Sequence, residues 1–287
     1  MTGKAMDVIT PILSADEMQF ILDLCIEAGN TAVEMRSSAD ITTKSHAEDL
    51  VTSADKALSD LLITRLQARF PEDTVLSEEA PWQSQNDGKR RWIIDPIDGT
   101  KYYVDGTGKY CVMVGLIIDG REAFGCLYIP QHKVGFYGGP TIGAYAYQDG
   151  STKRLEQAAL AESPLQKPGA KLRILVSKND LKANPWLEQL DDVALVTASS
   201  LGFDLYELHM DLADLFVHIR PTLGYWDTAA PGAVAQGMGL EVGTEEQDFL
   251  SYGYESPRHS PHVVIGKTGA LQAWRRILSE KAAKTET

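Results

Sequence analysis

The chain has 287 residues, of which 44% are hydrophobic and 23% charged, a composition that can bury a large core and excludes a disordered or collagen-like chain. Its 27 lysine and arginine residues stand against 40 aspartate and glutamate residues, and the net charge of −13 argues against binding to nucleic acid polymers or anionic membranes. No apolar run reaches the roughly 18 residues of a membrane helix, and no apolar leader follows the N-terminus. Three scattered cysteines without C-x-x-C spacing are typical of reduced thiols, so the sequence predicts a cytoplasmic globular protein.

The first half of the chain is predicted to hold two helices followed by a series of strands. Ser14 to Glu17 form a capping-box pattern, and apolar residues follow at helical spacing. A second helix is predicted to begin near Thr52 and to end by Phe70, because Pro71 follows. Strands are predicted at residues 74–76, 91–94, 110–118 and 122–129. The last two flank Asp119-Gly120, a dipeptide typical of a two-residue hairpin turn.

The second half is predicted to form a separate lobe. Residues 151–171 are rich in Lys, Gln, Glu, Pro and Gly, so we expect an N-terminal α+β lobe at 1–150 and a C-terminal α/β lobe at 151–287. In the second lobe, strands are predicted at 172–176, 193–197, 215–219 and 262–265, and helices at 201–210, from about 226, and at 270–278. The strands 172–176 and 193–197 have the apolar pattern of buried strands. Because strands and helices mix without strict βαβ alternation, the pattern favours an α+β fold in layers over a doubly wound parallel sheet.

Acidic residues gather at the ends of these elements in four segments. The segment 95–100, Asp-Pro-Ile-Asp-Gly-Thr, follows an apolar strand, and Ser77-Glu78-Glu79 ends another. Asp55 and Asp227 lie at the predicted starts of helices. Such carboxylates are costly to bury unless they are hydrogen-bonded or bind cations, and oxygen ligands without His or Cys favour Mg²⁺, with Mn²⁺ or Ca²⁺ as alternatives, over zinc. Each segment alone is also an ordinary turn or helix cap, so the prediction of a metal site depends on their combination.

Together, the segments 49–55, 77–79, 92–100 and 226–231 resemble the signatures of the inositol monophosphatase superfamily, the Mg²⁺-dependent, lithium-sensitive phosphatases. The resemblance extends over most of the chain, from the first predicted helix to the last strand. It implies a layered α/β/α/β/α sandwich of the inositol monophosphatase and fructose-1,6-bisphosphatase type. It also implies a hydrolase that acts on the phosphomonoester of a small metabolite through a metal-activated water, and it suggests a homodimer.

The resemblance further assigns roles to residues. Two or three Mg²⁺ ions, or Mn²⁺, would be held by Glu78, Asp95, Asp98, Asp227 and the backbone carbonyl of Ile97. Asp55 and Thr100 would position the water that attacks phosphorus, with Glu78 sharing that task. Lys44 matches a lysine that the family keeps near the metals, and a solvated loop lysine fits its position equally well. Most of the metal ligands thus fall in the first lobe and Asp227 in the second.

The substrate-binding residues predicted beside these ligands are Asp98, Gly99, Thr100, Lys101, Arg220 and Asp227. The backbone N–H groups of Gly99, Thr100 and Lys101 are expected to open a short helix and to cradle phosphate oxygens. Arg220 lies seven residues before Asp227, where the inositol enzymes usually place an acid that binds a sugar hydroxyl. A cation there suits a second phosphate, although an ion pair with a surface acid fits equally well.

Several short segments resemble the bacterial 3′(2′),5′-bisphosphate nucleotidases, namely Lys101 after the D-G-T, Gly108-Lys109-Tyr110, Val176-Ser177-Lys178 and Ser199-Ser200-Leu201. Asp180 and Gly202 depart from that branch, which usually has a histidine and a lysine there. The favoured function is therefore hydrolysis of a bisphosphate nucleotide such as adenosine 3′,5′-bisphosphate, with inositol monophosphatase activity as the alternative. A non-catalytic metal- or metabolite-binding regulator of the same fold is a remote third reading, because all the expected ligands and the water-positioning pair are present.

Overall fold

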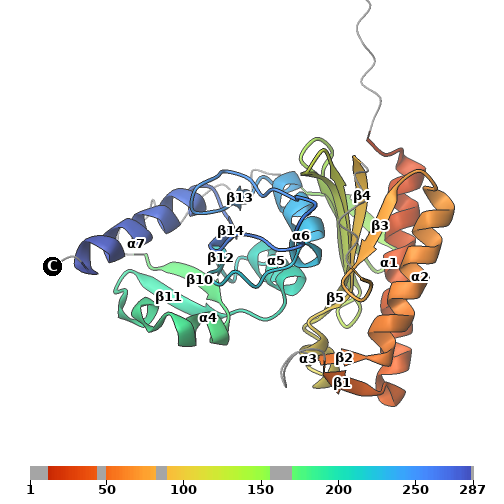
Figure 1. Cartoon of the computed structure of the whole chain (residues 1–287), viewed down its shortest axis with the longest axis horizontal. Helices are drawn as coiled ribbons and strands as arrows, with labels where there is room; N and C mark the ends of the chain where they lie inside the picture. Colours follow the sequence, from red (N-terminus) through yellow and green to blue (C-terminus); the bar gives the residue numbers. More distant parts are fainter. Residues whose placement is uncertain (1–11, 44–49, 82–88, 156–169, 286–287) are drawn as a thin grey trace, which may run out of the picture.

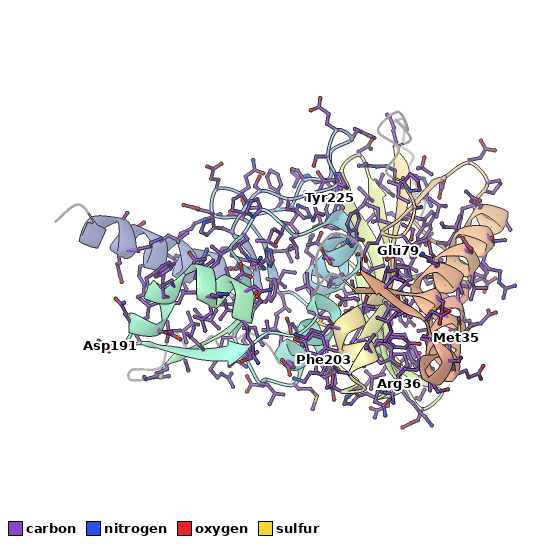
Figure 2. The ribbon with its side chains drawn as sticks, turned by 60° about the horizontal axis from the view of Figure 1, so that its bottom comes forward. Met35, Arg36, Glu79, Asp191, Phe203 and Tyr225 are labelled. Atoms are coloured by element: carbon purple, nitrogen blue, oxygen red, sulfur yellow. The ribbon has the colours of Figure 1, made fainter. Side chains whose placement is uncertain are left out.

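The computed structural model describes residues 12–43, 50–81, 89–155 and 170–285, which form five layers in the order helix, sheet, helix, sheet, helix (Figure 1). One outer layer consists of α1 (Ala15–Met35) and α2 (Ser53–Arg69), the central layer of α5 (Leu201–His209) and α6 (Tyr225–Gly237), and the last of α4 (Lys178–Ala183), the 3₁₀ helix η4 (Pro185–Gln189) and α7 (Ala270–Thr285). In Figure 2, Met35 and Arg36 lie toward one end of the molecule, Phe203 and Tyr225 near its middle and Asp191 at the other end. The layered sandwich predicted from the sequence is confirmed.

Both N-terminal helices begin where the sequence predicted, and each begins with a capping box, although only the one at Ser14 was predicted. The Ser14 hydroxyl accepts a hydrogen bond from the N–H of Glu17, and the Glu17 carboxylate accepts one from the N–H of Ser14. Thr52 and Asp55 make the same reciprocal pair at the start of α2. Between the helices lie the 3₁₀ helix η1 (Arg36–Ser38) and the small hairpin of β1 (Ile41–Thr43) and β2 (Leu50–Thr52).

The first sheet has seven strands in the order of the chain. They are β3 (Thr74–Ser77), β4 (Arg90–Asp98), β5 (Cys111–Ile118), β6 (Arg121–Ile129), β7 (Val134–Gly139), β8 (Gly143–Gln148) and β9 (Ser151–Arg154). Strands β3 and β4 are parallel and the other neighbours antiparallel, with the predicted hairpin joining β5 and β6. The sheet includes residues 151–154, which the division at residue 151 assigned to the second lobe; that two-lobe division stays a prediction.

Strand β4 does not end at Ile94, as the sequence predicted, but continues to Asp98. The pairing register of β4 with β5 shifts between Asp95 and Asp98. Asp95 pairs with Met113 and Asp98 with Cys111, so the chain advances three residues along β4 but two along β5. One extra residue in one strand is a β-bulge, a feature that bends a strand and redirects its side chains. The short helix α3 (Thr100–Val104) follows immediately.

The second sheet has five strands, in the order β11 (Val193–Thr197), β10 (Leu172–Val176), β12 (Leu215–His218), β14 (Val263–Gly266) and β13 (Glu241–Gly243). Strand β10 is buried as predicted, whereas β11 is only half-buried because it forms the edge of the sheet. Sequence periodicity does not distinguish an edge strand from a central one.

Helix α6 belongs to the second half of the sequence and packs against the first sheet. Gly115 and Gly125, which pair across β5 and β6, allow this close approach. A Cβ atom on Gly115 would lie 2.6 Å from the Cβ of Ala229, and one on Gly125 would overlap the backbone of Ala230. The two glycines therefore allow α6 to pack directly on β5 and β6.

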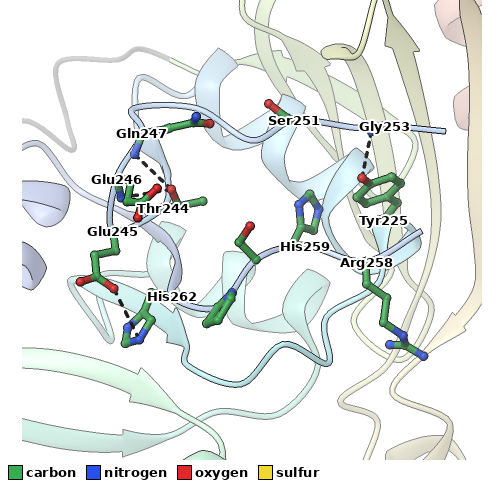
Figure 3. Close-up of a pocket in the computed structure, with 12 residues that line it drawn as sticks. Tyr225, Thr244, Glu245, Glu246, Gln247, Ser251, Gly253, Arg258, His259 and His262 are labelled. Carbon is green, nitrogen blue, oxygen red and sulfur yellow. Dashed lines mark hydrogen bonds and ion pairs between the residues drawn. The ribbon is translucent and has the colours of Figure 1, made fainter. Parts of the chain in front are cut away.

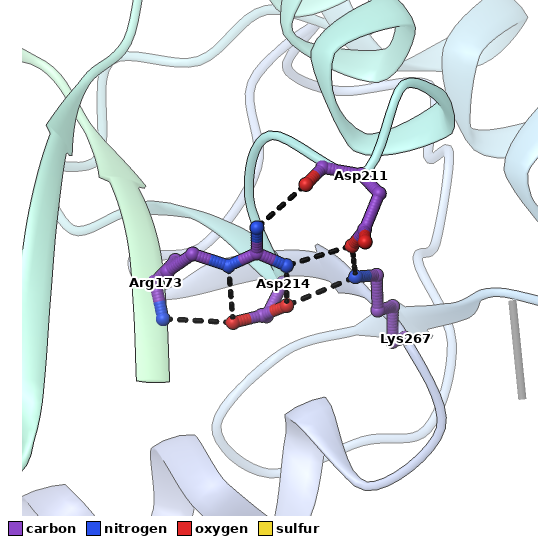
Figure 4. Close-up of polar contacts among 4 residues, drawn as sticks. All are labelled: Arg173, Asp211, Asp214 and Lys267. Carbon is purple, nitrogen blue, oxygen red and sulfur yellow. Dashed lines mark hydrogen bonds and ion pairs between the residues drawn. The ribbon is translucent and has the colours of Figure 1, made fainter. Parts of the chain in front are cut away.

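A group of charges around the buried Asp214 connects the second sheet to the loop before β12 (Figure 4). Asp214 is 2% exposed and accepts hydrogen bonds from Arg173 Nη2 at 2.6 Å and Lys267 Nζ at 2.9 Å. Burial acts to raise the pKa of Asp214, but these hydrogen bonds outweigh it and lower the pKa. Asp211 adds a second carboxylate to the same two cations. The fully paired group holds together three segments of the lobe that carries Arg220.

No helix in the described ranges combines the length and the apolar character needed to cross a bilayer. The three cysteines are all buried and free, as predicted.

Candidate active site

The structure brings together three of the predicted metal ligands. Asp95 and Asp98 come from the bulged end of β4, and Asp227 from the first turn of α6. One carboxylate oxygen from each of the three residues can be chosen so that all three atoms lie within 4.8 Å of one another. Asp95 and Asp98 are 2% and 5% exposed and Asp227 is half-buried, so two of the three carboxylates are nearly withdrawn from water. Lys44, the other residue that the resemblance placed near the metals, lies outside the described residues.

Backbone N–H groups orient each of the three aspartates. Asp95 Oδ1 accepts from the N–H of Ile97 at 3.1 Å, the Asx-turn geometry that an Asp-Pro-X sequence allows. Asp98 Oδ2 accepts from the N–H of Gly202 at 2.7 Å, and Asp227 Oδ2 from the N–H of Gly224 at 2.5 Å. The carboxylates are thus fixed before any ligand binds.

The electrostatics of this cluster favour bound cations. Burial raises the pKa of Asp95 well above its usual range, and nearby negative charges raise it further. Those charges belong to Glu78, Asp98, Asp227 and Asp55. Burial also raises the pKa of Asp98 to about 6 and that of Asp227 well above its ordinary value. Several carboxylates that repel one another in a dry site fit an oxygen-ligated divalent cation, since the cation compensates both the repulsion and the lost hydration.

Asp55 and Thr100, the predicted water-positioning pair, are in contact. The Asp55 carboxylate is 1% exposed, and its Oδ2 accepts from the N–H and the hydroxyl of Thr52 at 2.7 and 2.6 Å. Its Oδ1 lies 3.1 Å from the Thr100 hydroxyl, which lies at the same distance from the carbonyl oxygen of Ile97. The capping box of α2 therefore directs Asp55 toward the acid cluster.

Gly202 supports the acid cluster rather than the substrate cavity. A Cβ atom there would overlap the Sγ of Cys111 and lie 3.1 Å from Asp98 Oδ2. In this backbone, the lysine usual in the nucleotidase branch would collide with Cys111 and crowd Asp98. Gly202 departs from the nucleotidase pattern, and the structure adds a packing reason for a glycine at this position.

A cavity of about 400 Å³ opens beside the acid cluster. The predicted substrate residues that line it are Asp98, Gly99, Lys101, Arg220 and Asp227. Ser177, Lys178, Ser199, Ser200 and Leu201, from the two nucleotidase-like motifs, line it as well. Lys101, Lys178 and Arg220 contribute positive charge, whereas Thr100 lies beneath the cavity against Asp55. The cavity is large enough for a metabolite of nucleotide size.

Arg220 pairs with a buried acid instead of a surface acid. Its Nε donates to Asp180 Oδ1 at 2.9 Å, and its backbone N–H donates to the same oxygen at 3.2 Å. Asp180 is fully buried. Sequence analysis noted Asp180 only as a departure from the nucleotidase pattern and gave it no role, because nothing in the spacing of residues 180 and 220 indicates that they meet.

A second cavity, of about 570 Å³, lies behind the start of α6 (Figure 3). Its lining includes Tyr225, Glu245, Glu246 and His259. His259 Nε2 lies 2.6 Å from the Thr228 hydroxyl, and burial lowers the pKa of this histidine to about 3, so its ring is neutral. The lining holds two glutamates against one arginine, Arg258. The smaller cavity is therefore the candidate active site, since it alone combines the acid cluster with cations among the described residues.

A layered sandwich with a largely buried aspartate cluster beside a cavity that contains three cations fits a metal-dependent phosphatase. Residues 15–281 match the sequence model of the Inositol monophosphatase family, and the chain belongs to that family. A 3′(2′),5′-bisphosphate nucleotidase CysQ of Salmonella typhimurium is 30% identical over 248 residues, which cover 85% of this chain and 95% of the relative.

Solved structures confirm the fold. A Staphylococcal IMPase-I complexed with products has a TM-score of 0.74 at 21% identity, covering 93% of this chain and 96% of that one. An IMPase/NADP phosphatase complexed with Mg²⁺ and phosphate has a TM-score of 0.72 at 20% identity, covering 91% and 94%.

Proposed function

We propose that the chain is a Mg²⁺-dependent phosphatase that removes one phosphate from a 3′(2′),5′-bisphosphate nucleotide, with adenosine 3′,5′-bisphosphate as the favoured substrate. One observation carries the proposal. A single cavity joins the acid cluster at Asp98 and Asp227 to the cations Lys101, Lys178 and Arg220. The similarity to the Salmonella nucleotidase over most of both chains supports the same substrate class.

The residues that would hold Mg²⁺ are Glu78, Asp95, Asp98, Asp227 and the carbonyl of Ile97. All the donors are hard oxygen atoms, and the raised pKa values of the three aspartates indicate a site that is destabilised when it lacks cations. When bound, Mg²⁺ would neutralise the negative charge of the phosphate and lower the pKa of a water molecule.

The chain's own groups would orient the reactants. Thr100, directed by its contact with Asp55, would hold the attacking water through its hydroxyl, and Glu78 would share that task. Gly99, Thr100 and Lys101 form the start of α3. The first N–H groups of a helix have no acceptor within that helix, so these three could donate hydrogen bonds to phosphate oxygens. These contacts would fix the reacting phosphate at the end of the cavity nearest Asp98.

The opposite end of the cavity would bind the second phosphate. Lys178 begins α4, and Arg220 follows β12, so two elements of the second sheet's lobe supply cations there. An inositol monophosphate carries no second phosphate and would leave these two cations without a ligand contact. The arrangement therefore favours a bisphosphate over the inositol phosphate alternative.

A panel of phosphate-release assays tests the proposal. Adenosine 3′,5′-bisphosphate should give the highest kcat/KM when compared with inositol 1-phosphate and fructose 1,6-bisphosphate in Mg²⁺. A higher kcat/KM for inositol 1-phosphate would move the assignment to the alternative, and release from none would support the non-catalytic regulator. Excess EDTA should abolish turnover, and Li⁺ should inhibit at millimolar concentration; full turnover in EDTA would contradict the metal mechanism.

A further inference from the structure

We infer that Asp180 is a positioning residue that fixes Arg220 in the orientation needed to bind the substrate's second phosphate. The inference rests on the proposed function, because it concerns the far end of the same cavity. It assigns to Asp180 a role in choosing substrates with two anionic groups over those with one. Neither the sequence pattern nor the similarity to known nucleotidases gives this residue a role.

Asp180 is a buried carboxylate, and both of its oxygens accept hydrogen bonds. Its Oδ1 accepts from Arg220 Nε and from the Arg220 backbone N–H. Its Oδ2 accepts from the Ser177 hydroxyl at 2.6 Å, and His218 Nδ1 lies 3.3 Å from the same oxygen. Burial acts to raise the pKa of Asp180, but His218, Ser177 and Arg220 together lower it. The carboxylate is therefore charged at neutral pH in a place that excludes water.

This anchor restricts Arg220. A guanidinium group is planar, so a bond that fixes Nε also fixes the plane in which both Nη nitrogens lie. The second contact, from the Arg220 backbone to the same oxygen, fixes the start of the side chain as well. Arg220 is still one-third exposed and lines the cavity, so the group held at Nε can offer its Nη nitrogens to a ligand. The conformational entropy of a long side chain is then lost on folding and not on binding.

The pairing also changes what Arg220 can recognise. Asp180 offsets most of the long-range attraction of Arg220 for an anion. That attraction is left to the positive charges of Lys101 and Lys178, which line the same cavity. What Arg220 retains is direction, because two parallel N–H donors match two oxygens of one phosphate. A fixed donor pair of this kind binds a second phosphate strongly and a neutral hydroxyl weakly.

The competing explanation is a purely structural ion pair that joins α4 to the loop after β12. The two explanations differ in one measurable quantity. A structural pair affects all substrates equally through stability, whereas a positioning pair affects the preference between substrates. Adenosine 3′,5′-bisphosphate and adenosine 3′-monophosphate share the phosphate to be removed and differ only in the second phosphate, so the ratio of their kcat/KM values measures this preference.

The test compares Asp180→Asn and Arg220→Lys with the wild type. Asparagine keeps the shape and one acceptor but loses the charge, and lysine keeps the charge but loses the planar donor pair. Each variant should lower the ratio roughly tenfold, the lower range for a charge-assisted hydrogen bond. The loss should come from a higher KM for the bisphosphate, with kcat for both substrates changing much less.

Asp73→Asn is a matched control. Asp73 is a mostly buried aspartate that accepts from Arg90 Nε at 3.0 Å, and Arg90 has the same exposed fraction as Arg220, 33%. Arg90 begins β4, at the opposite end of the strand from Asp98. This control should lose stability without any change in the ratio, which separates a general effect of a broken ion pair from an effect on selection.

The wild type is measured first, so that the two proposals fail separately. A wild type without preference for the bisphosphate overturns the proposed function and this inference with it. A wild type that prefers the bisphosphate, with an unchanged ratio in a folded Asp180→Asn protein, overturns the inference alone. If Asp180→Asn does not fold, an unchanged ratio in Arg220→Lys overturns it. A lowered ratio in Arg220→Lys with an unchanged one in Asp180→Asn shows that Arg220 acts without its anchor and also overturns the role of Asp180.

Discussion

Replacing Asp98 by asparagine should stabilise the metal-free protein and abolish its activity. Burial raises the pKa of Asp98 to about 6 from an ordinary value of 3.8, a difference of about 2 units, or about 3 kcal/mol. The folded state therefore prefers the protonated carboxyl. Its stabilising effect is complete below about pH 4 and is lost as the pH rises through about 6. Asparagine is neutral throughout and can still accept from the N–H of Gly202.

Thermal unfolding in EDTA across pH 4 to 8 measures this effect. Near pH 4 the two proteins should melt at similar temperatures, and by pH 7 to 8 the Asp98→Asn variant should melt roughly 5–10 °C higher. Added Mg²⁺ should reverse the order, because only the wild type gains the binding free energy of an intact site. Asp191→Asn, a change of an exposed aspartate at the far end of the molecule, should show neither effect (Figure 2).

A variant that melts below the wild type in EDTA at every pH would refute the reasoning. That result would mean that the carboxylate of Asp98 is stabilised in the metal-free state, and that burial does not raise its pKa. Near-native turnover in the purified variant would separately refute the assignment of Asp98 as a ligand.

Three further predictions concern other parts of the site and its framework. Thr100→Ala should lower kcat by roughly two orders of magnitude with little change in KM, because the contact of the Thr100 hydroxyl with Asp55 orients the attacking water. An unchanged kcat with a raised KM would reassign Thr100 to substrate binding. Gly202→Ala should cost about 1–3 kcal/mol in urea unfolding and weaken Mg²⁺ binding, since its methyl group would overlap Cys111; a variant as stable as the wild type would show that the packing there is loose. Asp214→Ala should lower the free energy of unfolding by about 3 kcal/mol, because it leaves Arg173 and Lys267 beside a buried position that has lost its carboxylate. A loss below about 1 kcal/mol would show that the two cations are solvated without Asp214.

The sequence by itself determined the features whose causes are local. The capping box at Ser14, the start of the second helix near Thr52 and the turn at Asp119-Gly120 were predicted where the structure has them, because each depends on a few neighbouring residues. The motif segments also identified Asp95, Asp98 and Asp227, which the structure then brings within 4.8 Å of one another. The resemblance that united those segments implied the layered fold before any contact was known.

Only the tertiary structure decided the features that depend on contacts between distant segments. The extension of β4 to Asp98 depends on pairing with β5, and strand pairing is not encoded in the residues of one strand. Gly202 was interpreted as a lost lysine, and only its proximity to Cys111 shows that a side chain has no room. Asp180 was interpreted as a departure from a pattern, whereas the fold places its carboxylate against Arg220. In each case the deciding interaction joins residues far apart in the chain, and spacing along a sequence carries no information about which of its buried groups will meet.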